Sequence, residues 1–239
     1  MPHNRLYINA PLHVGDTVTI EDEQYHYIKK VLRAHSGDTV ELINGKGVLA
    51  SALLEKLGKD HCGAVITSST QDATPTVQLT LALALTKQSH LEYALEKATE
   101  VGAGRFLLFP ATRSEKEHIS ETQLKRLNSI IIAATKQCGR LFLPDLVIKS
   151  SLKDSVKSSN TLLFGDFGPH TQPLSALTLH SPVTFFVGPE GGFTEKEREF
   201  LITAGATGVS LHHNTLRAET AAVVATLLIH TQLTREYPT

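Results

Sequence analysis

The chain has 239 residues, of which 41% are hydrophobic and 20% are charged, values typical of a globular protein with room for one large domain or two smaller ones. Its formal net charge of −1 shows no basic surplus of the kind that many nucleic-acid-binding proteins carry, so any such binding face has to be a local patch. The sequence contains no apolar run of about 18 residues, so no membrane helix is predicted. The N-terminus lacks the apolar core of a signal peptide. Two distant cysteines, Cys62 and Cys138, predict neither a disulfide framework nor a zinc site, and we therefore expect a cytoplasmic protein.

Residues 1–72 are expected to form a small β-barrel. The segments 17–20 and 39–43 are rich in β-branched side chains, as strands tend to be, and turn signals separate them. A short helix is expected over residues 26–32. Short strands of this kind, divided by turns, are typical of small barrels. The polar stretch 68–75 predicts a linker, and we place the domain boundary after residue 72.

Residues 73–239 are expected to form a second domain, of the α/β class. Strand-like apolar runs cover residues 77–85, 105–109, 161–164, 183–187 and 209–211. Helical spacing of apolar residues marks the segments 91–98, 124–134 and 221–228. Thr194 and Glu197 have the spacing of a capping box and predict the start of a further helix. Because strands alternate with helices, the sequence predicts a mainly parallel sheet.

The most informative segment is the loop from Gly188 to Gly192, between an apolar strand and the capped helix. Ligands of open α/β sheets bind at the carboxyl ends of strands, and glycine lets backbone groups approach a ligand closely. Those groups could read an adenine edge or a ribose, and Glu190 could accept hydrogen bonds from hydroxyls. A phosphate cradle would show GxxxxGK[ST] or GxGxxG, and neither is present. A plain tight turn is the structural alternative.

A second informative segment, residues 216–221 (LRAETA), follows the last expected strand and opens the last helix. Glu219 in a first helical turn is favoured by the helix dipole, so it needs no function to explain it. Arg217 is disfavoured there by the same rule, which indicates a different role, such as pairing with Glu190 or Glu219, or holding a phosphate. His212 and His213 are adjacent and have no evident third partner, so no metal site is expected.

Taken together, these segments resemble the sequence motifs of the RsmE family. Members of that family are small-subunit ribosomal RNA methyltransferases of the SPOUT class that act on the N3 of a uridine. The two C-terminal signatures are matched by residues 187–193 (VGPEGGF) and 216–221 (LRAETA). Residues 97–102 (KATEVG) resemble the family's KATELG, residues 137–140 (QCGR) its EQCGR, and residues 31–33 (VLR) its HVLR. The matches occur in order along almost the whole chain.

The resemblance implies a PUA-like RNA-binding barrel followed by a parallel sheet whose final segment forms a trefoil knot. It also implies a homodimer that binds S-adenosylmethionine in the knot loops and contains no metal. By position, the cofactor-binding residues are Leu163, Phe164, Gly188, Pro189, Glu190, Gly191, Gly192, Leu211, Asn214, Leu216 and Ala218.

The chain also departs from the family pattern at several positions. Residues 87–90 (KQSH) stand where the family has KGDR, and residues 211–215 (LHHNT) stand where it has LGxRI. Ala133 and Lys136 occupy positions where glutamate is common. Both main signatures are intact, so these departures concern the contacts with the substrate rather than the family.

Methylation at N3 requires that the uridine first lose its N3 proton, so the enzyme has to supply a base or cations that favour the anion. Our catalytic candidates are Arg217, for anion stabilisation, and Glu219, as acceptor or positioner, with His26 and His90 as alternative bases. The substrate would be 16S ribosomal RNA, within the small ribosomal subunit, and its target base is expected to be flipped out of its stack. The candidate RNA-binding residues are Arg5, Lys29, Lys30, Arg33, Arg113 and Arg140, the last two within a modestly basic segment.

Three other functions are compatible with the sequence. The first is a related methyltransferase that acts on another RNA, such as transfer RNA. The second is an RNA-binding or assembly factor that keeps the fold and has lost catalysis. The third is a nucleotide-binding α/β enzyme, although its expected phosphate motif is missing. Binding of S-adenosylmethionine separates the first from the second, and methylation of defined RNAs identifies the substrate.

Overall fold

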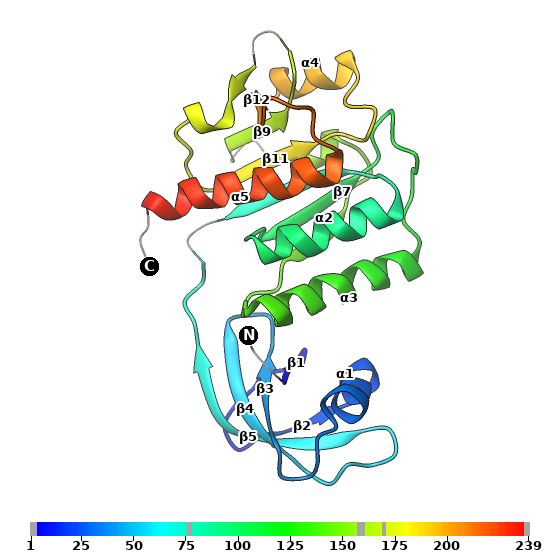
Figure 1. Cartoon of the computed structure of the whole chain (residues 1–239), viewed down its shortest axis with the longest axis vertical. Coiled ribbons are helices and arrows are strands. Elements are labelled where there is room, and N and C mark those ends of the chain that lie inside the picture. Colours follow the sequence, from blue (N-terminus) through cyan, green and yellow to red (C-terminus); the bar gives the residue numbers. More distant parts are fainter. Residues whose placement is uncertain (1–3, 76–77, 157–160, 169–170, 237–239) are drawn as a thin grey trace. The chain divides into compact units, whose positions relative to one another are not determined.

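The computed structural model of the chain describes residues 4–75, 78–156, 161–168 and 171–236 (Figure 1). The chain divides into two units. The first unit contains the residues up to Thr74 together with residues 132–143, and the second contains residues 75–131 and 144–239. The sequence does not predict that residues 132–143 belong with the N-terminal part of the chain.

The first unit contains a mixed five-stranded sheet with the strand order β1-β3-β4-β5-β2. Its strands are β1 (Arg5–Tyr7), β2 (Thr17–Ile20), β3 (Thr39–Ile43), β4 (Val48–Leu54) and β5 (Cys62–Gln71). β1 is parallel to β3, and the other neighbouring strands are antiparallel. The register shifts between Ser51 and Ala52 in β4, and such a bulge bends a strand. The result is a half-barrel.

The core of the first unit lies between this sheet and one helix. In β2, Val18 and Ile20 are buried while the threonines beside them are exposed, which is the alternation of a half-buried strand. α1 (Asp22–His26) continues directly as η1 (Tyr27–Leu32), so the helix begins earlier than the predicted segment 26–32. Its residues Tyr25 and Ile28 are buried in the same core.

The second unit is built on a seven-stranded sheet in which neighbouring strands are parallel. In the order β10-β12-β9-β11-β6-β7-β8, its strands are β10 (Gln172–Pro173), β12 (Thr207–Ser210), β9 (Thr161–Gly165), β11 (Val183–Val187), β6 (Leu79–Ala84), β7 (Arg105–Phe109) and β8 (Asp145–Ile148). The prediction of a mainly parallel sheet is confirmed. The edge strand β8 was not predicted because it is largely exposed and lacks a continuous apolar run. Val77, which opens the predicted strand 77–85, lies outside the described residues.

Helices accompany this sheet, and two of them pack side by side. α2 (Gln88–Glu100) contacts α5 (Ala218–Glu236), and α5 also contacts β6 and β11 (Figure 1). The other helices are α3 (Glu121–Cys138), α4 (Glu195–Thr203) and the single turns η2 (Lys153–Ser155) and η3 (Leu174–Ala176). The predicted capping box is confirmed, since Thr194 and Glu197 bond reciprocally at the start of α4. None of the helices in the described ranges is long and apolar enough to cross a membrane.

The strand register brings three loops to one edge of the sheet. β12, β9 and β11 are neighbours, with Val209 beside Gly165 and Phe164 beside Phe186. Because parallel strands end at the same edge, the segments that follow β9, β11 and β12 lie together there. β6 is the next neighbour of β11, so the start of α2 is brought to the same place.

Candidate active site

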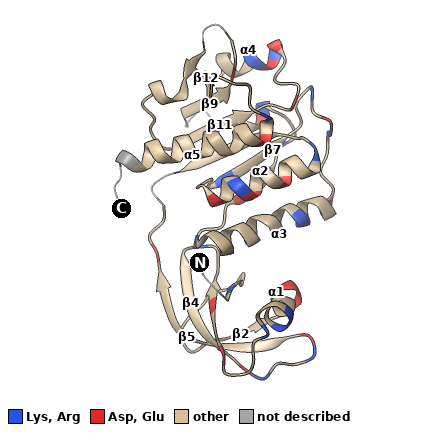
Figure 2. Cartoon of the chain, viewed as in Figure 1, with Lys and Arg blue, Asp and Glu red and all other residues tan. Residues whose placement is uncertain are grey.

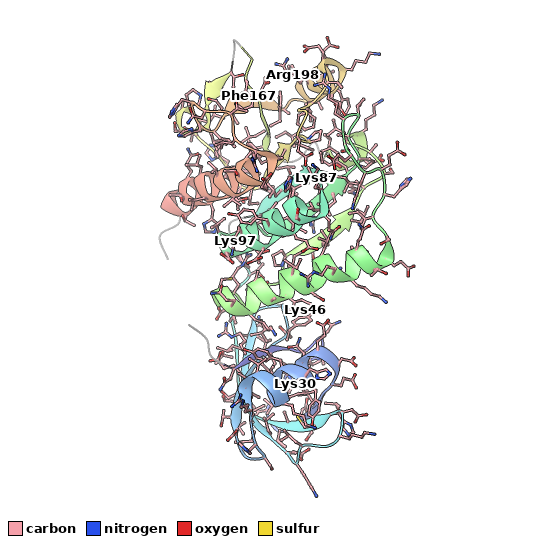
Figure 3. All side chains as sticks on the ribbon, turned by 45° about the vertical axis from the view of Figure 1, so that its right-hand side comes forward. Lys30, Lys46, Lys87, Lys97, Phe167 and Arg198 are labelled. Carbon is pink, nitrogen blue, oxygen red and sulfur yellow. The ribbon has the colours of Figure 1, made fainter. Side chains whose placement is uncertain are left out.

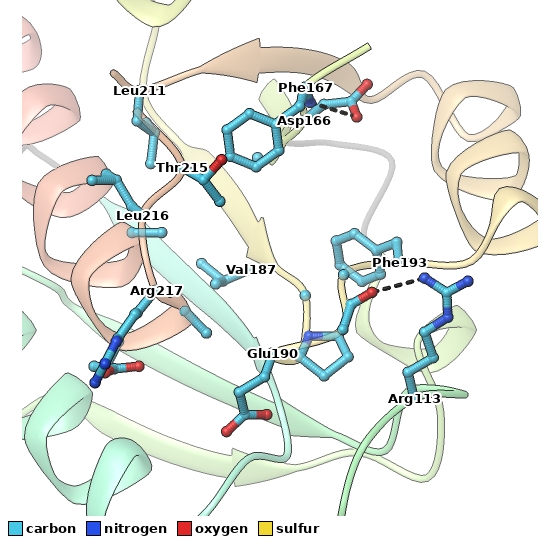
Figure 4. A pocket seen from close by; sticks show the side chains of 18 of the residues that line it. Arg113, Asp166, Phe167, Val187, Glu190, Phe193, Leu211, Thr215, Leu216 and Arg217 are labelled. Atoms are coloured by element: carbon cyan, nitrogen blue, oxygen red, sulfur yellow. Dashed lines mark hydrogen bonds between the residues drawn. The ribbon is translucent and has the colours of Figure 1, made fainter. Parts of the chain in front are cut away.

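A cavity of about 910 Å³ lies at this edge of the sheet (Figure 4). The segments that follow β9, β11 and β12 form its walls, and His90 and Arg113 complete them. Its volume falls in the range of roughly 300–1,000 Å³ that is usual for sites of small molecules. Most of the residues predicted from sequence to bind a cofactor line it, namely Gly188, Pro189, Glu190, Gly191, Gly192, Leu211, Asn214, Leu216 and Ala218.

Leu163 and Phe164 do not line this cavity. They are 1% and 0% exposed inside β9, where the sheet is covered on both faces. The wall begins directly after them, with Gly165, Asp166 and Phe167. Only the loop beyond the strand is free of the core, and therefore the candidate contacts lie a little later in the chain than the family resemblance indicates.

Two glycines suit the backbone of the loop after β11. A Cβ atom on Gly188 would lie 3.1 Å from the backbone nitrogen of Phe193, so a side chain there would require the loop to shift by a few tenths of an ångström. Gly192 has a φ of 68°, in the left-handed region that glycine adopts without steric cost. Its N–H donates to the carbonyl of Pro189 at 2.8 Å and closes the turn.

The segment after β7 holds this loop from outside. Arg113 Nη1 donates a hydrogen bond of 2.7 Å to the carbonyl oxygen of Gly191 (Figure 4). The backbone N–H of Thr112 donates to Glu197 Oε1 at 2.8 Å, which ties the same segment to the start of α4. The structure thus places Arg113 on the cavity wall, and its predicted contact with RNA stays a prediction.

The loop after β9 contributes residues that the sequence interpretation missed. Asp166 accepts a hydrogen bond from the backbone of Phe167 and forms an ion pair of 2.8 Å with Arg198 of α4. Burial raises the pKa of the Asp166 carboxyl, but hydrogen bonds from Arg198 and from the backbone outweigh burial and lower it. Phe167, 66% exposed, presents an aromatic ring at the cavity (Figure 3 and Figure 4). Gly165 and Gly168, which flank Asp166 and Phe167 in the sequence, were the signal that could have marked these two residues as a loop.

Three titratable side chains from different elements meet at the other wall. Nδ1 of His90, in α2, lies 3.1 Å from Glu190 Oε1 and 3.9 Å from Glu219 Oε2. Glu190 follows β11 and Glu219 lies in the first turn of α5. The side chain of Glu219 is 11% exposed, and its Oε2 is buried without a hydrogen-bond partner among the described residues.

Glu190 is held at the start of α2. It accepts hydrogen bonds from the His90 ring and from the backbone N–H of Lys87, the latter at 3.4 Å. Burial raises the pKa of its carboxyl, but these hydrogen bonds, together with one from its own backbone, outweigh burial and lower the pKa. An ionised carboxylate at a helix N-terminus is also favoured by the helix dipole. At neutral pH, Glu190 is therefore a negative group at this wall.

Arg217 lines the cavity with an exposed side chain (Figure 4). The sequence allowed an ion pair with Glu190 or Glu219. No such pair forms among the described residues, and both carboxylates lie beside His90 instead. The guanidinium of Arg217 is thus available to a ligand. This fits the other role that the sequence allowed, in which Arg217 holds a phosphate.

The basic residues predicted in the first unit fall into two groups. Arg5 is 8% exposed and pairs with Glu41 at 2.9 Å, so it joins β1 to β3 and is not placed to bind an RNA phosphate. Lys29, Lys30 and Arg33 are exposed at the end of the α1–η1 helix, whose first turn is acidic (Figure 2). They form a local basic patch.

Two further predicted residues lie outside the cavity. Arg140 is partly buried in the segment 132–143, and burial lowers the pKa of its guanidinium. His26 is exposed in the first unit, in α1, so His90 is the alternative base that lines the cavity. His212 and His213 stack on each other with ring centroids 4.0 Å apart, and within the described ranges no group of three or more metal-ligating side chains is found.

Comparison with known families assigns both parts of the chain. Residues 73–230 match the RNA methyltransferase domain. Residues 20–67 match the RNA methyltransferase PUA domain. The first match alone spans more than half of the chain.

Relatives of known name match the chain over nearly its full length. A ribosomal RNA small subunit methyltransferase E from Rickettsia conorii is 32% identical over 94% of both chains. The enzyme of the same name from Synechocystis is 31% identical over 96% of this chain and 78% of its own length. The crystal structure of ribosomal RNA small subunit methyltransferase E from Neisseria gonorrhoeae bound to S-adenosylmethionine is similar with a TM-score of 0.85 and 28% identity, over 96% of this chain and 98% of that one.

Proposed function

We propose that this chain, which belongs to the RNA methyltransferase family that includes ribosomal RNA small subunit methyltransferase E, methylates the N3 of a specific uridine in 16S ribosomal RNA, with S-adenosylmethionine as methyl donor. The observation that carries this proposal is the cavity at the ends of β9, β11 and β12, whose walls contain both family signatures, residues 187–193 and 216–221. The structural relative from Neisseria gonorrhoeae, with S-adenosylmethionine bound, supports it.

The residues of the cavity fit this cofactor. Gly188, Gly191 and Gly192 carry no side chains at the cavity, so a ligand there can meet backbone groups, as recognition of an adenine edge or a ribose requires. Phe167 supplies an exposed aromatic face on which a base can stack. We expect the loop from Gly188 to Gly192, with Leu211, Asn214, Leu216 and Ala218, to hold it. When bound, S-adenosylmethionine supplies an electrophilic methyl group next to a positively charged sulfur.

The protein has to help uridine lose a proton before its N3 can accept the methyl group. Its N3 carries a proton and becomes a nucleophile only when that proton leaves. Arg217 lines the cavity and forms no ion pair among the described residues, and a cation there would stabilise the negative charge that the base acquires. Glu219, in the same signature, lies beside His90 and would act as an acceptor or a positioning group. These two residues are our proposed catalytic residues.

The RNA and the oligomeric state complete the proposal. Lys29, Lys30 and Arg33 form the basic patch of the PUA unit and are proposed to contact phosphates, which makes binding sensitive to salt. We propose that the enzyme works as a homodimer on 16S ribosomal RNA within the small ribosomal subunit, in the cytoplasm. The named relatives support the RNA substrate. The dimer and the subunit context rest on the family resemblance.

The test is methylation of defined RNAs. The purified protein is incubated with S-adenosylmethionine and, separately, unmodified small ribosomal subunits, naked 16S ribosomal RNA and transfer RNA, and nucleosides are analysed by mass spectrometry. We expect N3-methyluridine from the small-subunit RNA and none in the Arg217→Ala variant. Methylation of transfer RNA alone would mean that transfer RNA, and not 16S ribosomal RNA, is the substrate. Failure to bind S-adenosylhomocysteine in calorimetry would indicate an assembly factor instead.

A further inference from the structure

We propose that His90 is the group that takes the N3 proton from the target uridine, with Glu190 and Glu219 holding its ring. The inference rests on the proposed function and names the proton acceptor that this function needs. His90 belongs to the segment 87–90, where the chain departs from the family pattern, so the assignment concerns this chain in particular.

Position is the first support. His90 lies in the first turn of α2, which follows β6, and it lines the cavity together with Arg217. Its side chain is 28% exposed, so it is partly open to the cavity and partly covered. The alternative base from the sequence, His26, lies in the other unit and does not line this cavity.

The neighbours of the ring determine which nitrogen can act. Nδ1 faces Glu190 Oε1 at 3.1 Å and Glu219 Oε2 at 3.9 Å. An ionised carboxylate accepts hydrogen bonds and cannot donate one, and the lowered pKa of Glu190 keeps that group ionised. In neutral His90, Nδ1 therefore carries the hydrogen, and Nε2 keeps a lone pair that can accept a proton.

The proton transfer balances with these groups alone. The N3 proton moves to Nε2 of His90, and the electron pair of the N–H bond stays on N3, which is then the nucleophile for the methyl group. The ring becomes an imidazolium whose positive charge lies beside two carboxylates, and both favour it. Because the ring is partly exposed, it can return the proton to water after the transfer.

The unpartnered oxygen of Glu219 fits the same role. A buried carboxylate oxygen without a hydrogen-bond donor is costly in a folded protein, and Oε2 of Glu219 is such an atom among the described residues. Nδ1 of His90 lies 3.9 Å from it. A positive charge on the ring would strengthen the attraction between them, so Glu219 is placed to stabilise the imidazolium that the proton transfer produces.

The experiment compares His90→Gln with His180→Gln, a control whose exposed side chain precedes β11 at the opposite edge of the sheet. Turnover of 16S ribosomal RNA should fall roughly 100-fold in His90→Gln, with S-adenosylhomocysteine affinity within about twofold of the unmodified protein, since a glutamine amide can still donate a hydrogen bond to Glu190 and keep it in place. The lost rate should recover as pH rises, because hydroxide then removes the N3 proton. The charged groups that face the ring are Glu190, after β11, and Glu219, in α5.

A second readout does not depend on turnover. In protein labelled with ¹⁵N-histidine, the nitrogen shifts of His90 should report the tautomer with hydrogen on Nδ1. Hydrogen on Nε2, turnover of His90→Gln close to that of the unmodified protein, or a loss that pH does not restore would overturn the role of His90. If the unmodified protein itself forms no N3-methyluridine, the proposed function fails instead.

Discussion

Arg113 Nη1 donates a hydrogen bond of 2.7 Å to the carbonyl oxygen of Gly191, so a side chain from the segment after β7 fixes the glycine loop of the cavity. Glycines leave a loop flexible unless something outside it restricts the backbone. Arg113 and the bond from Thr112 to Glu197 supply that restriction here. The shape of the proposed cofactor site therefore depends on a segment that contains neither family signature.

Arg113→Ala should weaken the binding of S-adenosylhomocysteine. Loss of a hydrogen bond to a charged donor at an exposed site costs about 1 kcal/mol, which corresponds to roughly fivefold in the dissociation constant. Calorimetric titration measures it. Arg126→Ala is the matched control, because Arg126 is 63% exposed, pairs with Glu92 at 3.4 Å and does not line the cavity. Equal affinities in the two variants would mean that Arg113 does not shape the site.

Gly192→Ala should destabilise the protein and also impair cofactor binding. Gly192 has a φ of 68° with open space around it, so the cost is the left-handed backbone, about 1–2 kcal/mol for a residue with a Cβ. Gly205, with a φ of 87° and equally open surroundings, lies after α4 and does not line the cavity. Gly205→Ala should show the same loss in denaturant unfolding with unchanged affinity for S-adenosylhomocysteine. If both glycine variants bind normally, the conformation at Gly192 is irrelevant to the ligand.

Glu197 should make stability fall at acidic pH. Burial raises the pKa of its carboxyl, but hydrogen bonds from Thr112 and Thr194 outweigh burial and lower it. A lowered pKa in the folded state stabilises the protein above the unfolded value of roughly 4.3, and this contribution disappears as pH falls through the folded pKa. Glu197→Gln should therefore lose less stability than the unmodified protein between pH 7 and pH 3 in urea unfolding. Parallel curves for the two proteins would rule out this linkage.

Lys30→Ala should weaken RNA binding by loss of a phosphate contact. Each such contact releases counterions, so removing one should lower the slope of log affinity against log salt by about 1. Filter binding of 16S ribosomal RNA at several salt concentrations measures that slope. Arg5→Ala should behave differently, since buried Arg5 pairs with Glu41, and its loss should reduce stability while the slope is retained. An unchanged slope in Lys30→Ala would place the RNA elsewhere on the PUA unit.

Sequence patterns predicted those features whose causes lie within a few residues. The capping box of Thr194 and Glu197 and the buried strand β11 each depend on neighbouring residues, and each is present. The edge strand β8 escaped prediction because the sheet supplies its partner while its own side chains remain largely exposed.

By itself, the sequence determined the fold class, the family and two of the loops that form the cavity, those at residues 188–192 and 211–218, because apolar periodicity and the two signatures are local properties of the chain. Only the tertiary structure decided which side chains meet. His90 and Glu190 are 100 positions apart, and they come together because β11 pairs with β6 and places the loop after one strand beside the helix after the other. Strand order is set by the packing of the whole sheet, and no local pattern encodes it.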